Sequence, residues 1–357
     1  MKLNLQNPFK SDLKRPILIS GPCSAESAEQ VMETCVNLAK YNVNMLRAGV
    51  WKPRTRPNNF EGHGTPALEW IVNAGKATNL PVTIEVATAK HVMEALEAGI
   101  DVLWIGARTT VNPFAVQEIA DALKGVDIPV MVKNPINPDL ELWLGAFERL
   151  NNSGITKLAA IHRGFSSYEK GKYRNEPHWE IPIELKRRFP ELRLICDPSH
   201  ITGDRQYLLE VSQEAMDLNY DGLMIESHRD PSVALSDAKQ QLTPDALGEM
   251  MKKIVLRKVS TENAQFNNKL EELRSKINKI DDQIVDILSE RMKVARDIGT
   301  YKKENNITIL QPSRWDEIIM KKLEQSKNKG LSEKFITELF QSIHNESIMR
   351  QNEIMNG

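Results

Sequence analysis

Residues 16–22, PILISGP, form the first of eight short apolar runs that decide the fold of this chain. The other runs are VNMLRAG (43–49), PVTIEV (81–86), VLWIGA (102–107), PVMVKN (129–134), KLAAIHRG (157–164), RLICDPSH (193–200) and GLMIESH (222–228). Segments able to form helices separate the runs. Runs that are apolar on both faces are typical of buried parallel strands, and eight alternations favour a closed (β/α)8 TIM barrel. An open doubly wound sheet would need a glycine-rich dinucleotide turn after the first strand, and GPCSAE is not that turn.

Length and composition exclude several classes of protein. A chain of 357 residues suits a barrel-sized domain plus a smaller one. Its net charge of −1 argues against a general nucleic-acid binder. The N-terminus has no apolar signal region, no stretch approaches a membrane span, and three cysteines give no disulfide framework. We therefore expect a cytoplasmic protein without membrane or nucleic-acid partners.

The sequence becomes polar after the last apolar run, and the pattern that follows is typical of helices. We expect the barrel at residues 1–255, a linker at 256–266 and an all-helical domain at 267–357. The expected helices of that domain span 267–304, 312–326 and 332–354.

Two sets of polar side chains stand at the carboxyl ends of the barrel runs, the face that carries barrel active sites. The first set combines a thiol, an imidazole and two carboxylates, which suits a catalytic first-row divalent metal. Its members are Cys23, His200, Glu226 and Asp237. The second set holds six cations, which suit substrates with more than one phosphate or carboxylate. Its members are Arg47, Lys52, Arg54, Arg108, Lys133 and Arg163.

An apolar seam with a spacing of four and three runs along the first expected helix, and Arg291 interrupts it. Its members are Leu273, Ile277, Ile280, Ile284, Ile287, Arg291, Val294, Ile298 and Tyr301. So long a stripe exceeds what its own small domain can bury, which indicates a homodimer. A seam cation marks either an anionic ligand between helices or a register device in a coiled-coil-like dimer.

Further polar groups are compatible with a ligand site, and the spacing alone leaves both interpretations open. Lys302 falls about 20° from Arg291 around the helix, whereas Arg274 points elsewhere, toward a partner chain. Ser347 and Gln351 share a face of the third helix. Three cations and two neutral polar groups suit a small dicarboxylate.

The barrel motifs resemble those of the type I 3-deoxy-D-arabino-heptulosonate 7-phosphate (DAHP) synthases of the β subfamily. The motifs, in order over residues 10–255, are GPCSAE, LRAGVWKPRT, WIGAR, VKNP, IHRG, CDPSH and IESH followed by DPSVALSDAKQQL. This family condenses phosphoenolpyruvate with erythrose 4-phosphate at the start of the shikimate pathway. The related synthase that makes 3-deoxy-manno-octulosonate 8-phosphate is the alternative, and KPRT favours the erythrose enzyme.

The resemblance implies a role for each member of both sets. Cys23, His200, Glu226 and Asp237 would bind the divalent metal (Mn, Co, Fe or Zn). Arg108, Lys133, Arg163 and Arg47 would bind phosphoenolpyruvate. Lys52, Arg54 and Thr55 would meet erythrose 4-phosphate, with Lys52 nearest the reacting carbonyl, and Glu85 would orient a water. Arg56, His162 and the ALSDAK loop depart from the family pattern.

The helical motifs resemble the all-helical chorismate mutases. LRSKINKIDDQIVDILSERMKVARDIGTYKK, QPSRWDEI and LFQSIHNESIMRQ carry this resemblance over residues 267–355. It implies a pocket that converts chorismate to prephenate without a cofactor. The pocket residues would be Arg274 of the other subunit, Arg291, Lys302, Arg314, Ser347 and Gln351. Gln311 and Trp315 depart from some members.

The two resemblances together imply a bifunctional transferase and isomerase of aromatic amino acid biosynthesis. We expect the helical domain to act also as the allosteric sensor, with prephenate or chorismate as the effector. Alternatively, this domain is mainly a regulatory and dimerisation module with weak catalysis.

Overall fold

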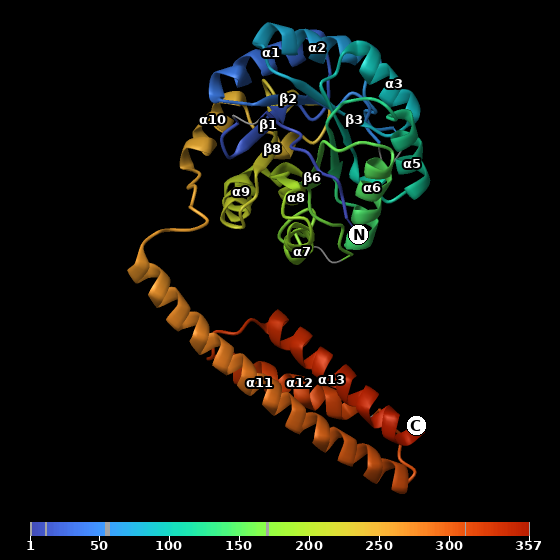
Figure 1. The fold of residues 1–357 in the computed structure, drawn as a ribbon, viewed down its shortest axis with the longest axis vertical. Coiled ribbons are helices and arrows are strands. Elements are labelled where there is room, and N and C mark those ends of the chain that lie inside the picture. Colours follow the sequence, from blue (N-terminus) through green and yellow to red (C-terminus); the bar gives the residue numbers. More distant parts are fainter. Residues whose placement is uncertain (1, 11–12, 54–57, 169–170, 311, 357) are drawn as a thin grey trace. The chain divides into compact units, whose positions relative to one another are not determined.

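The structure is a computed structural model that describes residues 2–10, 13–53, 58–168, 171–310 and 312–356. The chain separates into two compact units, Met1–Val259 and Ser260–Gly357. The first is an α/β barrel, and the second consists of helices (Figure 1).

Eight parallel strands form the closed barrel of the first unit, which confirms the fold expected for this part of the chain. The strands are β1 (Ile17–Gly21), β2 (Met45–Ala48), β3 (Val82–Val86), β4 (Val102–Ile105), β5 (Val130–Lys133), β6 (Leu158–His162), β7 (Arg193–Cys196) and β8 (Gly222–Glu226). Each strand pairs with the next, and β1 closes the barrel against β8 from Ile17↔Gly222 to Gly21↔Glu226. All eight strands lie within the apolar runs.

Helices surround the strands (Figure 1). The longer ones are α1 (Ala28–Leu38), α2 (Pro66–Thr78), α3 (Ala89–Ala98), α5 (Pro113–Ala122), α6 (Leu140–Asn152), α7 (Glu180–Arg188), α9 (Leu208–Asp217) and α10 (Pro244–Lys253). Two short helices, α4 (Ala107–Thr110) and α8 (Pro198–Thr202), follow β4 and β7 directly. Side-chain caps begin many of them: Ser27 accepts a hydrogen bond from the Gln30 amide, and Asp139 from the Leu142 amide. These caps fix where the helices after β1 and β5 begin.

Two hydrophobic cores stabilise the barrel. One fills its interior and includes Ile19, Trp104 and Met131, all fully buried. The other lies between the strands and the surrounding helices and includes Trp143 and Phe147. Strands buried on both sides explain why the runs are continuously apolar.

The second unit consists of α11 (Ala264–Glu304), α12 (Pro312–Ser326) and α13 (Glu333–Asn356). Helix α11 begins three residues earlier than expected, because the Asn263 side chain accepts a hydrogen bond from the Phe266 amide and caps the helix there. Helix α13 packs along α11 and also against α12. The helices approach closely at Gly299, where a Cβ atom would lie 3.0 Å from the Gln351 Cα.

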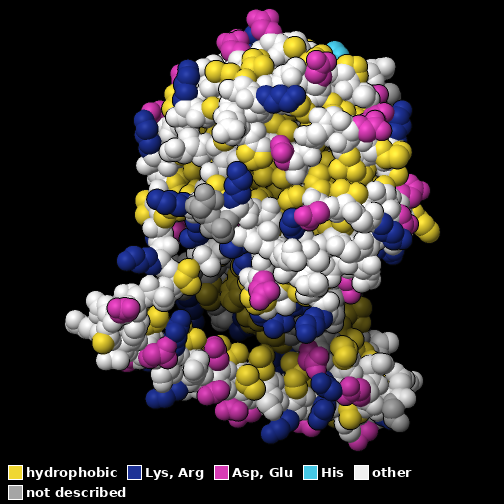
Figure 2. Space-filling model, turned by 45° about the horizontal axis from the view of Figure 1, so that its top comes forward, with side chains coloured by type: hydrophobic (Ala, Val, Ile, Leu, Met, Phe, Trp, Pro, Cys, Tyr) yellow, Lys and Arg dark blue, Asp and Glu magenta, His cyan; other side chains and the backbone are white. Residues whose placement is uncertain are grey.

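The apolar seam of α11 stays exposed within one chain. Ile280 is 54% exposed and Ile287 63% exposed, whereas Ala295 and Gly299 are buried against α13. Figure 2 shows apolar side chains among the charged ones along this unit. Helix α13 therefore covers a stripe beside the seam, and the apolar side chains of the seam stay exposed. None of the described helices has both the length and the apolar character of a membrane span.

Candidate active sites of the two units

The carboxyl ends of the barrel strands bring Cys23, Lys52 and Asp237 together. The Lys52 ammonium donates to the Cys23 carbonyl oxygen at 2.7 Å and to its Sγ at 3.1 Å. The Cys23 Sγ lies 3.3 Å from Asp237 Oδ2. Burial, reinforced by Glu226, raises the pKa of the Cys23 thiol to about 12. A thiolate ligand at this position therefore requires positive charge beyond that of the neighbouring Lys52.

His200 and Glu226 form a second pair at the same end of the barrel. His200 Nε2 lies 3.7 Å from Glu226 Oε1, and its Nδ1 lies 2.8 Å from Asp197 Oδ2. Burial lowers the pKa of His200, which favours the neutral ring. Glu226 Oε2 accepts a hydrogen bond from Gln240 at 2.7 Å. The buried Glu226 Oε1 accepts none, although Arg47 lies 3.0 Å away.

The four donors fit a first-row divalent metal in chemistry, and two pairs of them have the spacing of its ligands. Ligand atoms around one such ion lie about 3.0–3.8 Å apart, because each bond is about 2.0–2.3 Å long. Both the Cys23–Asp237 and the His200–Glu226 distances fall in this interval. However, among the described residues no three His, Cys, Asp or Glu side chains form a group that could hold a metal ion. The described residues therefore form two donor pairs.

Buried cations surround this donor set. Lys133, at the end of β5, is 4% exposed and pairs with Asp197 at 2.8 Å. Arg163 follows β6, and its guanidinium donates to the Asn175 side chain at 2.8 Å. Burial lowers the pKa of Arg163 to about 10, which leaves it charged at neutral pH. Arg47 lies inside the barrel on β2 and faces the Trp104 ring at 5.1 Å. A fifth cation of the set, Arg108, lies exposed in α4.

Glu85 has a fixed place beside these cations. The Trp104 indole donates a hydrogen bond to Glu85 Oε2 at 3.0 Å. A Cβ atom at Gly106 would lie 2.1 Å from Glu85 Oε1, so that only glycine leaves room for the carboxylate. Arg54, Thr55 and Arg56 lie outside the described residues.

Three further residues, to which the sequence assigned no role, contact the donors and cations at the strand ends. Arg174 pairs with Asp237 at 2.8 Å, Gln240 holds Glu226, and Asp197 joins Lys133 to His200. Burial alone would raise the pKa of Asp197, but His200 and Lys133 hold it well below its usual range. Asp197 stands in a strand-end motif and was detectable in the sequence. Arg174 comes from an irregular loop without periodicity and was not.

His162, which departs from the family pattern, has a structural role. Its Nε2 lies 2.6 Å from the Pro177 carbonyl oxygen, and its Nδ1 lies 2.9 Å from the Tyr220 hydroxyl. A carbonyl only accepts, so Nε2 carries the proton and Nδ1 accepts from Tyr220. Burial lowers the pKa of His162 to about 3, and the ring stays neutral.

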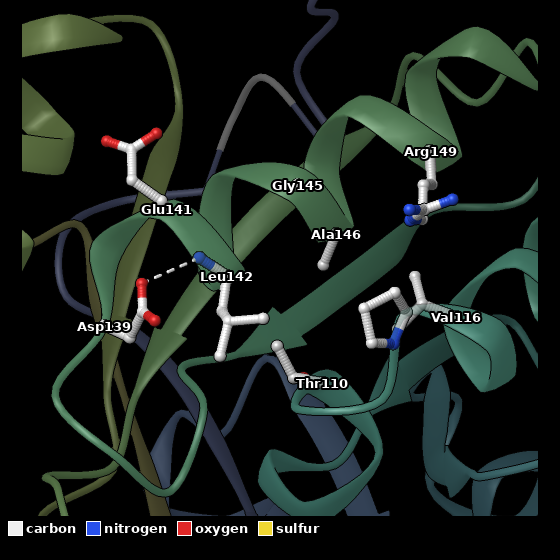
Figure 3. A pocket seen from close by; sticks show the side chains of 9 residues that line it. Thr110, Val116, Asp139, Glu141, Leu142, Gly145, Ala146 and Arg149 are labelled. Carbon is white, nitrogen blue, oxygen red and sulfur yellow. Dashed lines mark hydrogen bonds between the residues drawn. The ribbon is translucent and has the colours of Figure 1, made fainter.

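A cleft of about 350 Å³ opens between α5 and α6 (Figure 3). Its polar rim is engaged by the protein itself: Asp139 caps α6, and Arg149 donates to Gln117 at 3.0 Å. Thr110 on its wall donates to the Lys133 carbonyl oxygen at 2.9 Å. The cleft therefore lies beside Thr110, which holds the Lys133 backbone. It does not lie among the metal-type donors and cations at the strand ends.

The second unit brings four of its six expected site residues to the α11–α13 region. The Arg291 guanidinium donates to the Ser347 hydroxyl, and Ser347 donates to the Ile343 carbonyl oxygen at 2.7 Å. Lys302 donates to the Ile309 carbonyl oxygen at 2.6 Å. Gln351 is 8% exposed, and its buried side-chain oxygen has no hydrogen-bond partner. Burial lowers the pKa of Arg291.

The other two expected residues lie apart. Arg274 is exposed on α11 and pairs with Glu271 at 2.7 Å, and Arg314 is exposed on α12 and pairs with Glu317 at 2.5 Å. No hydrogen bond or ion pair among the described residues joins either one to Arg291. Trp315 stacks on His344 with ring centroids 4.5 Å apart. Gln311 lies outside the described residues.

Comparisons with known proteins agree with both units. The family model described as DAHP synthetase I matches residues 6–262, and the model described as chorismate mutase type II matches residues 273–352. A phospho-2-dehydro-3-deoxyheptonate aldolase of Thermotoga maritima is 32% identical over 237 residues, which are 66% of this chain and 68% of that protein. A crystal structure of a DAHP synthase from Thermotoga maritima matches with a TM-score of 0.61 and 31% identity, covering 67% of this chain and 68% of that one.

The helical unit has relatives of its own. A bifunctional chorismate mutase/prephenate dehydratase of Buchnera aphidicola is 38% identical over 90 residues, which are 25% of this chain and 23% of that protein. The chain thus spans less than a quarter of that relative.

Proposed function

The chain belongs to the DAHP synthetase I family and ends in a type II chorismate mutase domain, and from this premise we propose how each unit works. The barrel condenses phosphoenolpyruvate with erythrose 4-phosphate to DAHP and phosphate, and the helices rearrange chorismate to prephenate. The observation that carries the first proposal is the meeting of metal-type donors and buried cations at one end of the barrel.

In the barrel, Cys23, His200, Glu226 and Asp237 would hold a divalent ion. When bound, this ion supplies Lewis acidity to the aldehyde of erythrose 4-phosphate. Each of the two donor pairs already has the spacing of ligands to one ion. Arg174 and Gln240 orient the two carboxylates.

The cations position two anionic substrates that would otherwise repel each other. Lys133, Arg163, Arg47 and Arg108 would bind phosphoenolpyruvate. Lys52 would lie nearest the reacting carbonyl, with Arg54 and Thr55 on the phosphate of the sugar. Glu85, held by Trp104, would orient the water that adds before phosphate leaves. Much of the rate then comes from positioning and electrostatics.

In the helical unit, Arg291 and Arg274 would bind the carboxylates of chorismate. Lys302 and Gln351 would hydrogen-bond the ether oxygen, where negative charge develops. Ser347 and Arg314 complete the pocket, and no cofactor is needed. Arg274 would come from a second copy of the chain, which would also cover the exposed seam of α11.

We further propose that this homodimer works in the cytoplasm and that prephenate, bound by the helical unit, inhibits the barrel. Such coupling requires that prephenate bind two states of the protein with different affinities. The test is the rate of DAHP formation by the purified chain with and without saturating prephenate. An unchanged rate contradicts the regulatory role and leaves the two activities untouched.

An assay of both reactions on the purified chain tests the main proposal. Erythrose 4-phosphate should be consumed with phosphoenolpyruvate, and chorismate should yield prephenate. Turnover of arabinose 5-phosphate in its place would assign the barrel to the related octulosonate synthases. Barrel turnover with only weak mutase turnover would make the helical unit mainly a regulatory and dimerisation module.

A further inference from the structure

Trp51 and His91 form a parallel ring stack beside the barrel site. Their ring centroids lie 4.0 Å apart, and the ring planes differ by 3°. Trp51 directly precedes Lys52, and His91 lies in the first turn of α3, which follows β3. One βα unit of the barrel thus contributes a ring that supports the segment carrying Lys52 in the preceding unit. Both side chains are half-buried, so the contact also excludes water from that segment.

The edge of the His91 ring is tied to the strand that carries Glu85. His91 Nδ1 accepts a hydrogen bond from the Ala87 amide at 3.3 Å, and Ala87 is the first residue after β3. Because Nδ1 accepts, the proton of the ring is on Nε2. Burial lowers the pKa of His91, in agreement with a neutral ring.

Two backbone hydrogen bonds hold the segment around Lys52. The Lys52 amide donates to the Glu61 carbonyl oxygen at 2.9 Å, and the Gly64 amide donates to that of Val50 at 3.2 Å. The Lys52 side chain then passes Gly49 to reach Cys23. A Cβ atom at Gly49 would lie 2.7 Å from Lys52 Cδ and 2.2 Å from the Cys23 carbonyl oxygen.

We propose that His91 is a positioning residue that sets the placement of Lys52 relative to Glu85. Its ring face holds Trp51 and hence Lys52, and its Nδ1 holds Ala87 and hence the end of the strand that carries Glu85. Neither function requires contact between His91 and a substrate. The inference rests on the proposed DAHP synthase activity, in which both residues act at one reacting centre.

Steady-state kinetics of DAHP formation, with each substrate varied in turn, test this inference. His91→Ala removes both contacts. We expect kcat/KM for erythrose 4-phosphate to fall about 10-fold or more, because displacements of 1 Å cost up to about 100-fold. The KM for phosphoenolpyruvate should stay within about twofold, because a different set of cations binds it.

Two variants separate the contacts of His91. His91→Phe keeps a flat ring without the acceptor, so the KM for erythrose 4-phosphate should return toward the wild-type value while kcat stays low. His91→Asn keeps an acceptor without the ring, so kcat should recover while that KM stays raised. Lys90→Ala, at the exposed neighbouring residue of α3, is the matched control and should keep wild-type constants.

Two results would overturn the inference. One is wild-type kinetics in His91→Ala. The other is an equal loss of kcat in all three variants with both KM values unchanged and a lower melting temperature, which marks a purely structural residue. A wild-type chain that forms no DAHP contradicts the proposed function instead, so the two failures are distinguishable.

Discussion

The Arg291 guanidinium donates a hydrogen bond to the Ser347 hydroxyl, and this bond joins the seam of α11 to α13 of the same chain. Arg291 thereby lies at the border between two faces of α11. One face, with Ala295 and Gly299, is buried against α13, and the other carries the exposed apolar seam. A cation at this border can meet a ligand that enters between the helices.

Replacing Arg291 with alanine should lower chorismate mutase turnover by about 100-fold or more, because a preorganised charged donor is lost. The helices should stay folded, since Arg291 forms no ion pair among the described residues. Turnover is measured by the loss of chorismate absorbance, and helicity by circular dichroism. Arg296→Ala, at an exposed arginine five residues further along α11, is the control. Wild-type turnover in Arg291→Ala would contradict a role in ligand binding. Arg291 would then be a register device of a coiled-coil-like dimer.

The exposed seam predicts that Ile284→Glu dissociates a dimer. An unpaired charge buried between helices costs about 3–5 kcal/mol, which weakens association more than 100-fold. Sedimentation velocity at micromolar concentration should show a dimer for the wild type and a monomer for the variant, which should also lose mutase activity. Lys279→Glu changes an exposed residue outside the seam and should leave the dimer intact. A wild-type chain that sediments as a monomer contradicts the dimer.

Removal of divalent metal should abolish the barrel reaction and leave the mutase reaction unchanged. The reason is that the four proposed ligands all lie in the barrel unit, while the helical site needs no cofactor. Both rates are measured after dialysis against a chelator and again after Mn²⁺ is added back. Loss of both reactions, or of neither, contradicts this separation.

The buried ring of His162 should make the barrel less stable in mild acid. Its folded pKa of about 3 lies below the unfolded value near 6.5, so only the unfolded state binds the proton as the pH falls between these values. The free energy of unfolding should therefore fall by about 2 kcal/mol between pH 7 and pH 5 through this group alone.

Urea denaturation of the wild type and of His162→Gln at both pH values measures this effect. The variant should be less stable at pH 7, because Tyr220 loses its partner, and should show a correspondingly smaller pH dependence. Equal pH dependence in the two proteins would assign the effect to other groups.

The strands of the barrel were predictable because each is short, apolar on both sides and bounded by a helical segment. The start of α11 was misplaced because the cap at Asn263 is a single hydrogen bond within a polar stretch that has no periodicity. Local signals of this kind are common in polar segments and identify a helix start only when the helix is already known.

In the site, sequence position alone places Lys133 and Glu226 at strand ends. It does not reveal that Arg174 reaches Asp237, because 63 residues separate them and the loop that carries Arg174 has no regular pattern. The His91–Trp51 stack likewise depends on the placement of two neighbouring βα units. Contacts of this kind depend on the closed barrel, so they cannot be predicted from the sequence before the fold is known.

The pairing of β1 with β8 also constrains how the chain is made. Strand β1 pairs with β2, which is synthesised soon after it, and with β8, which ends only at Glu226. At 5–20 residues per second, a ribosome needs roughly 10–40 s to synthesise the intervening chain. During that interval the nascent sheet carries an unpaired edge at β1, which is prone to pair with other chains. Chaperone protection of this nascent edge is therefore most valuable before the last strand leaves the ribosome.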